Sequence, residues 1–242
     1  MNTIKRAIIM AAGKGTRLWP LTKTVPKPLV PVNGSPMIET IINALMTQGV
    51  HEIYVVVGYL KEKYDYLVVQ YPNVQLIDNP YYDTANNISS LYVAREYLSD
   101  VLILDGDQVI SNPVILTPQF SASGYCAIWS EEETAEWLLT VNEENLVQSC
   151  SRTGGKQGWQ LLSVSRWTAE DGERLMRHLE IEFEAKRHHD IYWDDVALFC
   201  YPDDYQLQIY PIERSDMIEI DSLEELVMMD VSYAALLKRE ES

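Results

Sequence analysis

The chain has 242 residues, of which 47% are hydrophobic, and its formal net charge is −17. Such a negative charge argues against general nucleic-acid binding, which depends on neutralising phosphates with lysine and arginine. No run of the sequence approaches the roughly 18 uninterrupted apolar residues of a membrane-spanning helix. Three widely spaced cysteines form neither a metal-ligand pattern nor a disulfide framework. The composition therefore predicts a cytoplasmic protein without membrane insertion.

The first half of the chain alternates strand-like and helix-like segments. Short apolar runs predict strands, and apolar residues at helical spacing predict the helices between them. In chain order we expect a strand at 7–10, a helix from 36 to near 49, a strand at 53–57, a helix ending near 71, a strand at 74–77, a helix at 88–98 and a strand at 101–104. This alternation predicts an α/β fold with a Rossmann-like, doubly wound and mainly parallel sheet.

The second half has a different pattern, with short strands expected at 125–129, 137–141 and 146–150. A long helix is expected to begin at Thr168, with acidic residues in its first turn. Residues 217–221 alternate strictly between apolar and polar, and 222–225 form a capping-box pattern that begins the last helix. We expect one domain over 1–242, with a smaller β-rich lid or insert in its second half.

A glycine loop follows the first predicted strand directly. It consists of Ala11, Ala12, Gly13, Lys14, Gly15, Thr16 and Arg17. Glycines allow backbone N–H groups to approach a ligand closely, and the two basic side chains can neutralise phosphate charge. The spacing matches neither the dinucleotide fingerprint nor the Walker A loop. The loop therefore predicts phosphate binding of another kind.

Lys27 stands between two prolines, ten residues beyond Arg17. Prolines hold the chain extended and restrict how far the lysine can move. Residues 1–38 contain no Asp or Glu, although the protein as a whole is acidic. This positive region is expected to attract a small anion.

The segment at 11–39 resembles a known signature. It reads AAGKGTRLWPLTKTVPKPLVPVNGSPMIE and is similar to the signature of the nucleotidyltransferases that make sugar nucleotides and CDP-alcohols. The resemblance implies that residues 1–120 bind a nucleoside triphosphate through the glycine loop. It also implies that Arg17 and Lys27 are the catalytic cations, and that residues 121–242 hold the acceptor and a second metal-binding acid.

The expected cofactor is Mg²⁺, held by carboxylates. Asp105 and Asp107 follow a buried strand, where open α/β sheets bind their ligands, and Mg²⁺ needs only one or two carboxylates beside substrate phosphates. Asp107 is expected as the first metal ligand, and the resemblance implies Asp221, after a late strand, as the second. Glu219, on the same face of that strand, is a supporting candidate. Asp105 either contributes to the nucleotide site or closes a turn before Gly106.

Four segments resemble the bacterial phosphocholine cytidylyltransferases in particular. They are Asn86–Leu91, Glu136–Trp137, Tyr192–Asp194 and Glu219–Asp221. The resemblance implies CTP and phosphocholine as substrates and CDP-choline and pyrophosphate as products. A quaternary ammonium is held by aromatic faces and nearby negative charge. Trp137, Tyr192, Asp194 and Glu219 are therefore the expected acceptor-binding residues, whereas Trp193 is expected to pack inside.

Several alternatives stay open at this stage. Asn86 and Ser89 are expected near the nucleotide, although Asn86 could equally cap the following helix. Phosphoethanolamine, 2-aminoethylphosphonate or a sugar 1-phosphate could replace phosphocholine as the acceptor. A nucleotide-binding regulatory subunit without turnover is an alternative of another class.

Overall fold

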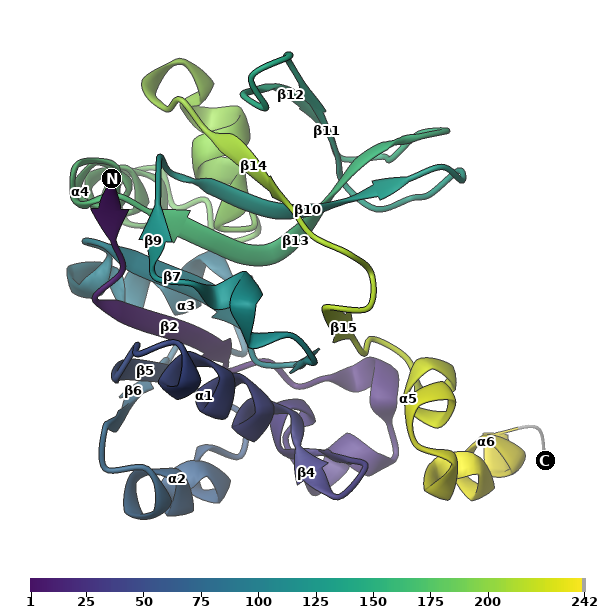
Figure 1. Cartoon of the computed structure of the whole chain (residues 1–242). Helices are drawn as coiled ribbons and strands as arrows, with labels where there is room; N and C mark the ends of the chain where they lie inside the picture. Colours follow the sequence, from purple (N-terminus) through teal and green to yellow (C-terminus); the bar gives the residue numbers. More distant parts are fainter. Residues whose placement is uncertain (241–242) are drawn as a thin grey trace.

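The computed structural model describes residues 1–240, and its main feature is one sheet of nine strands (Figure 1). Seven of these strands follow the order β12, β11, β13, β7, β2, β5, β6. The other two extend the sheet from β13: β10 pairs with β13, and β14 pairs with β10. Their bounds are β2 (Arg6–Ala11), β5 (Glu52–Val57), β6 (Val74–Asp78), β7 (Val101–Asp105), β10 (Gly124–Ser130), β11 (Leu138–Val141), β12 (Val147–Ser151), β13 (Gly158–Trp167) and β14 (Gln208–Pro211).

The centre of the sheet is parallel, as predicted. β2 pairs with β5 on one side and β7 on the other, and β6 pairs with β5, all in parallel register. These strands are short runs of Val, Ile and Leu, and their interior is buried. Continuous apolar strands are typical of parallel sheets covered on both faces.

Helices cover both faces of the parallel strands. On one face, α1 (Met37–Thr47) and α2 (Asp65–Gln70) share a hydrophobic cluster with Ile9 of β2. On the other face, α3 (Ile88–Val93) and α4 (Ala169–Glu180) share a second cluster with Ile8. Successive side chains of a strand point to opposite faces, so β2 contributes to both clusters. The predicted doubly wound arrangement is confirmed.

β13 joins the β-rich half to the parallel strands, and the sequence analysis did not predict it. β10 pairs antiparallel along the whole of β13. The opposite edge of β13 pairs with β7 at residues 164–167 and with β11 at residues 159–160. In Figure 1 the strands β10 to β14 lie above β2, β5 and β6. The β-rich half is thus a continuation of the central sheet.

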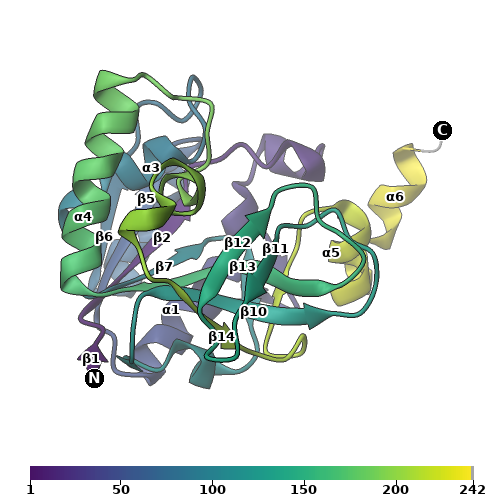
Figure 2. The same ribbon diagram turned by 90° about the horizontal axis from the view of Figure 1, so that it is seen from above.

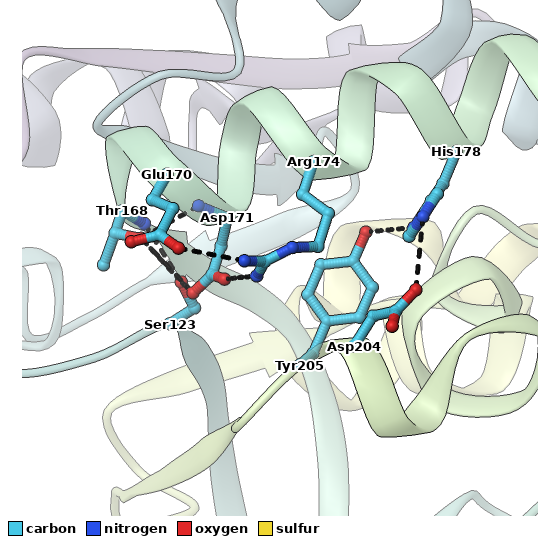
Figure 3. A network of polar contacts seen from close by, with 8 residues as sticks. All are labelled: Ser123, Thr168, Glu170, Asp171, Arg174, His178, Asp204 and Tyr205. Atoms are coloured by element: carbon cyan, nitrogen blue, oxygen red, sulfur yellow. Dashed lines mark hydrogen bonds and ion pairs between the residues drawn. The ribbon is translucent and has the colours of Figure 1, made fainter.

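Helix α4 begins where predicted and is fixed by a polar network (Figure 3). The Oγ1 of Thr168 accepts a hydrogen bond from the Asp171 N–H at 3.1 Å, as a helix N-cap does. Further along the helix, His178 lies 2.8 Å from the Tyr205 hydroxyl. Burial lowers the pKa of His178. Figure 2 shows α4 running beside the sheet, apart from β11 and β12.

The C-terminal segment returns to the N-terminal loops. β15 (Met217–Glu219) pairs with β8 (Gln108–Ile110), and the predicted capping box begins α5 (Leu223–Met229). Leu223 and Leu226 pack in one cluster with Leu18. The contact in Figure 1 between the yellow α5 and the purple N-terminal segment therefore brings residues 219–221 beside the glycine loop.

The remaining elements are small. They are the pair β1 (Asn2–Thr3) and β9 (Gln119–Phe120), the pair β3 (Pro31–Val32) and β4 (Ser35–Pro36), and helix α6 (Ala234–Glu240). The predicted helix at 88–98 is divided into α3 and a 3₁₀ turn at 95–97. All three cysteines are free. Within residues 1–240, every helix is too short or too polar to cross a lipid bilayer.

Candidate active site

A cavity of about 480 Å³ lies at the carboxyl ends of β2 and β7. Its walls come from both halves of the chain. The lining comprises residues 10–13, Gly15, Arg17, Lys27, Pro28, Asn86, Asn87, Ser90, Asp105, Asp107, Glu136, Trp137, Gln160, Leu161, Ser163, Tyr192, Asp194, Glu219 and Asp221. Most of the residues predicted from the sequence are therefore brought together in one place.

The glycine loop forms one wall of this cavity. Gly15 has a φ of 59°, and a Cβ there would lie 2.7 Å from the Cβ of Lys27, so a glycine is needed at this position. Gly13 and Gly15 line the cavity, but Lys14 and Thr16 do not. The amine of Lys14 is instead paired with Asp83. The predicted nucleotide contacts of Lys14 and Thr16 are therefore not reproduced in this conformation.

Both predicted catalytic cations line the cavity and are paired with acids. The Nζ of Lys27 donates to Asp107 at 2.6 Å and to Asp221 at 2.8 Å. Arg17 forms an ion pair with the same Asp221 at 2.7 Å, and its side chain is 69% exposed. Burial alone would lower the pKa of Lys27, but the two carboxylates raise it. Lys27 therefore carries a positive charge in a buried position.

Three carboxylates form the strongest candidate metal site within the described residues. Asp105, Asp107 and Glu219 each offer an oxygen atom, and these atoms lie within 4.8 Å of one another. Gly106, in the turn between Asp105 and Asp107, packs closely against the glycine-loop side of the cavity, since a Cβ there would lie 3.0 Å from Cγ of Pro28. Burial and the neighbouring carboxylates raise the pKa of Asp105 and of Glu219 well above the ordinary values.

This grouping changes the roles predicted for two residues. Glu219 was expected both at the acceptor end and as a supporting metal acid, and its contacts place it with the metal carboxylates because β15 pairs with β8 directly after Asp107. Asp105 was expected near the nucleotide and belongs to the same cluster. Asp221, the second predicted ligand, lines the cavity beside it and joins Lys27 to Arg17.

The residues present fit a magnesium ion. Mg²⁺ prefers carboxylate oxygens, and Asp107 Oδ1 is buried without a hydrogen-bond partner. A divalent cation would relieve the repulsion among the three acids, which Lys27 offsets only in part. Asp107, Asp105 and Glu219 would hold the ion, with Asp221 beside them.

Metal-free protein should lose stability as the pH rises. Unfolded carboxyl groups titrate near pH 4, whereas the raised pKa values of Asp105 and Glu219 keep these groups protonated to higher pH in the folded state. The folded protein then binds more protons than the unfolded one, so unfolding becomes easier as the pH increases. Melting temperatures between about pH 5 and 8 should fall more steeply in chelator than in Mg²⁺. The Glu219→Gln variant should have a shallower slope in chelator, and equal slopes in the two buffers would contradict the assignment.

Helix α3 begins beside the glycine loop, and its first residues differ from the prediction. The side chain of Asn87 accepts from the Trp193 N–H at 2.9 Å, and that of Asn86 donates to the Asp190 carbonyl at 3.1 Å. The N-cap residue Asn87 makes no side-chain capping bond, and Asn86 Oδ1 accepts from the adjacent Asn87 N–H at 2.7 Å. Ser89 does not line the cavity, because its buried hydroxyl donates to Asn86 at 2.8 Å. The neighbouring Ser90 lines the cavity instead.

The acceptor end of the cavity is aromatic and acidic. The rings of Trp137 and Tyr192 meet edge to face with centroids 5.8 Å apart. Glu136 and Asp194 lie in the same lining. Trp193 is buried in the core, as predicted. Three lining residues on β13, namely Gln160, Leu161 and Ser163, were missed because the strand itself was missed.

Comparison with known proteins agrees with this geometry. Residues 6–121 match the family described as nucleotidyl transferase. The chain is 42% identical, over 96% of its length and 94% of the relative's, to the 2-aminoethylphosphonate cytidylyltransferase of Lancefieldella rimae. It is 34% identical, over 91% of its length and 94% of the relative's, to the choline-phosphate cytidylyltransferase of Streptococcus pneumoniae.

Solved structures give the same result. The CTP:phosphocholine cytidylyltransferase of S. pneumoniae superimposes with a TM-score of 0.88 at 33% identity, over 95% of this chain and 99% of that one. The inositol-1-phosphate CTP transferase of T. maritima shares the fold, with a TM-score of 0.74 at 18% identity over 100% of this chain and 98% of that one. The chain therefore belongs to the nucleotidyl transferase family, and the protein is an enzyme of this kind.

Proposed function

We propose that the protein transfers the cytidylyl group of CTP to 2-aminoethylphosphonate and releases pyrophosphate. CTP is supported by the two cytidylyltransferases that align with almost the whole chain. The choice of a primary amine depends on one observation in the acceptor end of the cavity. The proposed acceptor, 2-aminoethylphosphonate, therefore differs from the phosphocholine expected from the sequence.

That observation is the environment of Asp194. Its side chain lies in the cavity lining, its buried Oδ1 makes no hydrogen bond of normal geometry, and the Tyr125 hydroxyl is its polar neighbour. Burial raises the pKa of Asp194 to about 7. An unpaired buried oxygen is unfavourable, and a hydrogen bond to a charged group contributes about 1.5–3 kcal/mol. A primary ammonium can donate that bond, whereas a quaternary ammonium cannot.

The reaction requires positioning and charge neutralisation by this chain. A phosphonate oxygen of the acceptor attacks the α-phosphorus of CTP, a new P–O bond forms, and the bond to the β-phosphate oxygen breaks. Gly13 and Gly15 would hold the triphosphate through their backbone N–H groups, with Arg17 and Lys27 neutralising its charge. Mg²⁺, when bound, would supply additional charge stabilisation at the phosphates. No side-chain nucleophile takes part.

Phosphocholine is the second candidate acceptor. Trp137 and Tyr192 present aromatic surfaces at the same end of the cavity, and each cation–π contact with a trimethylammonium group contributes about 0.5–2 kcal/mol. The 34% identical relative is named for this substrate. The two acceptors differ in the ammonium group, which donates hydrogen bonds only in 2-aminoethylphosphonate, and in length, because phosphocholine has an ester oxygen between phosphorus and carbon.

Pyrophosphate release with Mg²⁺ tests the proposal. CTP, UTP, ATP and GTP are each paired with 2-aminoethylphosphonate, phosphoethanolamine, phosphocholine and glucose 1-phosphate. We expect turnover with CTP, and a kcat/KM for 2-aminoethylphosphonate at least about tenfold above that for phosphocholine, because only the primary ammonium can donate a charged hydrogen bond to Asp194.

Each outcome decides between the alternatives. A preference for phosphocholine would show that the aromatic pair dominates over Asp194. Turnover with another base or with the sugar phosphate would remove the cytidylyl or acceptor assignment. Folded protein that binds nucleotide without turnover on any pair would support the regulatory-subunit alternative.

A further inference from the structure

An ion pair outside the cavity connects two segments that carry the acceptor residues. Arg152 directly follows β12, and its guanidinium lies 2.5 Å from Asp195 Oδ1. The side chain of Asp195 is only 5% exposed, whereas that of Arg152 is 49% exposed. Neither residue lines the cavity. The ion pair therefore joins the β11–β12 hairpin to the segment at 192–200 from behind the cavity wall.

Asp195 also binds the backbone of Tyr192, a residue that lines the cavity. Its second oxygen, Oδ2, accepts a hydrogen bond from the backbone N–H of Tyr192 at 2.8 Å. One carboxylate thus fixes Arg152 on one side and the backbone of an expected acceptor residue on the other. The contact with Arg152 is an ion pair, and the contact with the Tyr192 N–H is a hydrogen bond to a charged group, which is stronger than a neutral one.

Arg152 also contacts the aromatic residues around this point. Its guanidinium lies 3.8 Å from the ring centroid of Phe199 and 5.9 Å from that of Trp137. The Trp137 ring meets Phe199 edge to face, with centroids 5.5 Å apart. A planar guanidinium can stack on a ring and pair with a carboxylate at once, which an ammonium group cannot do equally well.

We propose that Arg152 is a positioning residue for the acceptor, which together with Asp195 fixes the placement of Trp137 relative to Tyr192. Trp137 precedes β11 and Tyr192 belongs to a distant segment, and Arg152 contacts the surroundings of both. This inference rests on the proposed function, since it takes these two residues as the acceptor wall. Arg152 itself contacts neither substrate nor the metal carboxylates in this arrangement.

The expected effect is selective. The glycine loop, Arg17 and Lys27 lie at the other end of the cavity and do not depend on Arg152. Loss of the ion pair should therefore weaken acceptor binding while leaving CTP binding in place. A displacement of Trp137 relative to Tyr192 should change the affinity for the acceptor more than the rate of the chemical step. We therefore expect the acceptor KM to change more than kcat.

The test compares three variants by steady-state kinetics. Arg152→Met keeps the length and apolar contact of the side chain but removes the charge, and we expect the acceptor KM to rise about tenfold with the CTP KM and melting temperature almost unchanged. Arg152→Lys should recover much of the affinity, because it can still pair with Asp195. Arg95→Met is the matched control: Arg95 pairs with Glu180 at 3.0 Å and lies 4.2 Å from the centroid of the Tyr92 ring, away from the cavity.

Hydrogen exchange of the segment at 190–197 supplies a readout that needs no acceptor. The Tyr192 amide, which donates to Asp195, should exchange faster in Arg152→Met than in wild type or in Arg95→Met. Unchanged exchange, or faster exchange with an unchanged acceptor KM, would overturn the inference. Equal rises in both KM values with a lower melting temperature would indicate a structural role only.

The steady-state measurements on the Arg152 variants use whichever acceptor the wild-type enzyme turns over. If that acceptor is not 2-aminoethylphosphonate, the proposed substrate is wrong while the role of Arg152 is still measured on the correct one. If no acceptor is turned over, the proposed function fails, and binding of 2-aminoethylphosphonate to wild type and Arg152→Met is compared by calorimetry. Equal binding, or none to either protein, would then overturn the inference.

Discussion

Replacing Asp107 by alanine should lower turnover by about three orders of magnitude while the protein stays folded. Asp107 offers the one oxygen of the metal cluster that is buried and without a partner, and its other oxygen fixes the Lys27 ammonium at 2.6 Å. The fold should survive because the substitution removes one of several carboxylates that repel each other. Pyrophosphate release and thermal unfolding measure the two effects.

The matched control for this substitution is Asp78→Ala. Asp78 ends β6, a parallel strand of the same sheet, and pairs with Lys61 outside the cavity. Its loss should leave turnover close to that of the wild-type enzyme. Near-normal turnover of Asp107→Ala would remove Asp107 from the metal site.

Replacing Lys27 by methionine should reduce kcat by about two to three orders of magnitude. Lys27 is 6% exposed and is held at a fixed position by Asp107 and Asp221, so a water molecule or a flexible side chain cannot take its place. Its removal also leaves these acids without their shared cation. The melting temperature of the variant should therefore fall at neutral pH and recover in Mg²⁺.

Lys61→Met serves as the comparison for Lys27→Met. Lys61 donates to Asp78 at 2.6 Å, the same length as the Lys27 contact, but its side chain is 55% exposed. An exposed ion pair contributes about 0–1 kcal/mol, so stability and turnover should hardly change. A Lys27→Met enzyme that retains wild-type kcat would show that the lysine only stabilises the carboxylates.

The sequence predicted those parts of the site whose signals are local. The glycine loop, the turn at Asp105–Asp107 and the capping box at Ser222 each depend on residues a few positions apart. Ser89 was predicted at the nucleotide site, but Ser90 lines the cavity, because the residues at the start of α3 do not indicate which face meets it. The buried hydrogen bond of Ser89 to Asn86 decides that question.

The longest strand was missed for a physical reason. β13 lies half in the buried parallel region and half among exposed strands, so its burial follows no period of two. The pattern that identifies half-buried strands is then absent. Without β13, its three cavity residues could not be predicted either.

The ion pairs of Asp221 could not be read from the sequence. Asp221 meets Lys27 across 194 positions of the chain, and only the packing of α5 on the N-terminal loops brings them together. Sequence reasoning identified the carboxylate, but its neighbours depend on that packing. The contact of Glu219 with Asp107 likewise depends on a long-range feature, the pairing of β15 with β8.

Because β13 belongs to both halves of the sheet, it also connects the two ends of the cavity. The Leu161 N–H donates to the Trp137 carbonyl at 2.9 Å at the acceptor end, and Val164 pairs with Leu104, the residue before Asp105, at the metal end. Leu161 and Val164 lie on opposite sides of the point where β13 passes from β11 to β7, and its pairing with β10 shifts register in the same stretch. A single strand therefore joins the cavity wall at Trp137 to the strand end that carries Asp105. A displacement of the β11–β12 hairpin would be passed through β13 to the metal carboxylates, so the two ends of the cavity are mechanically coupled.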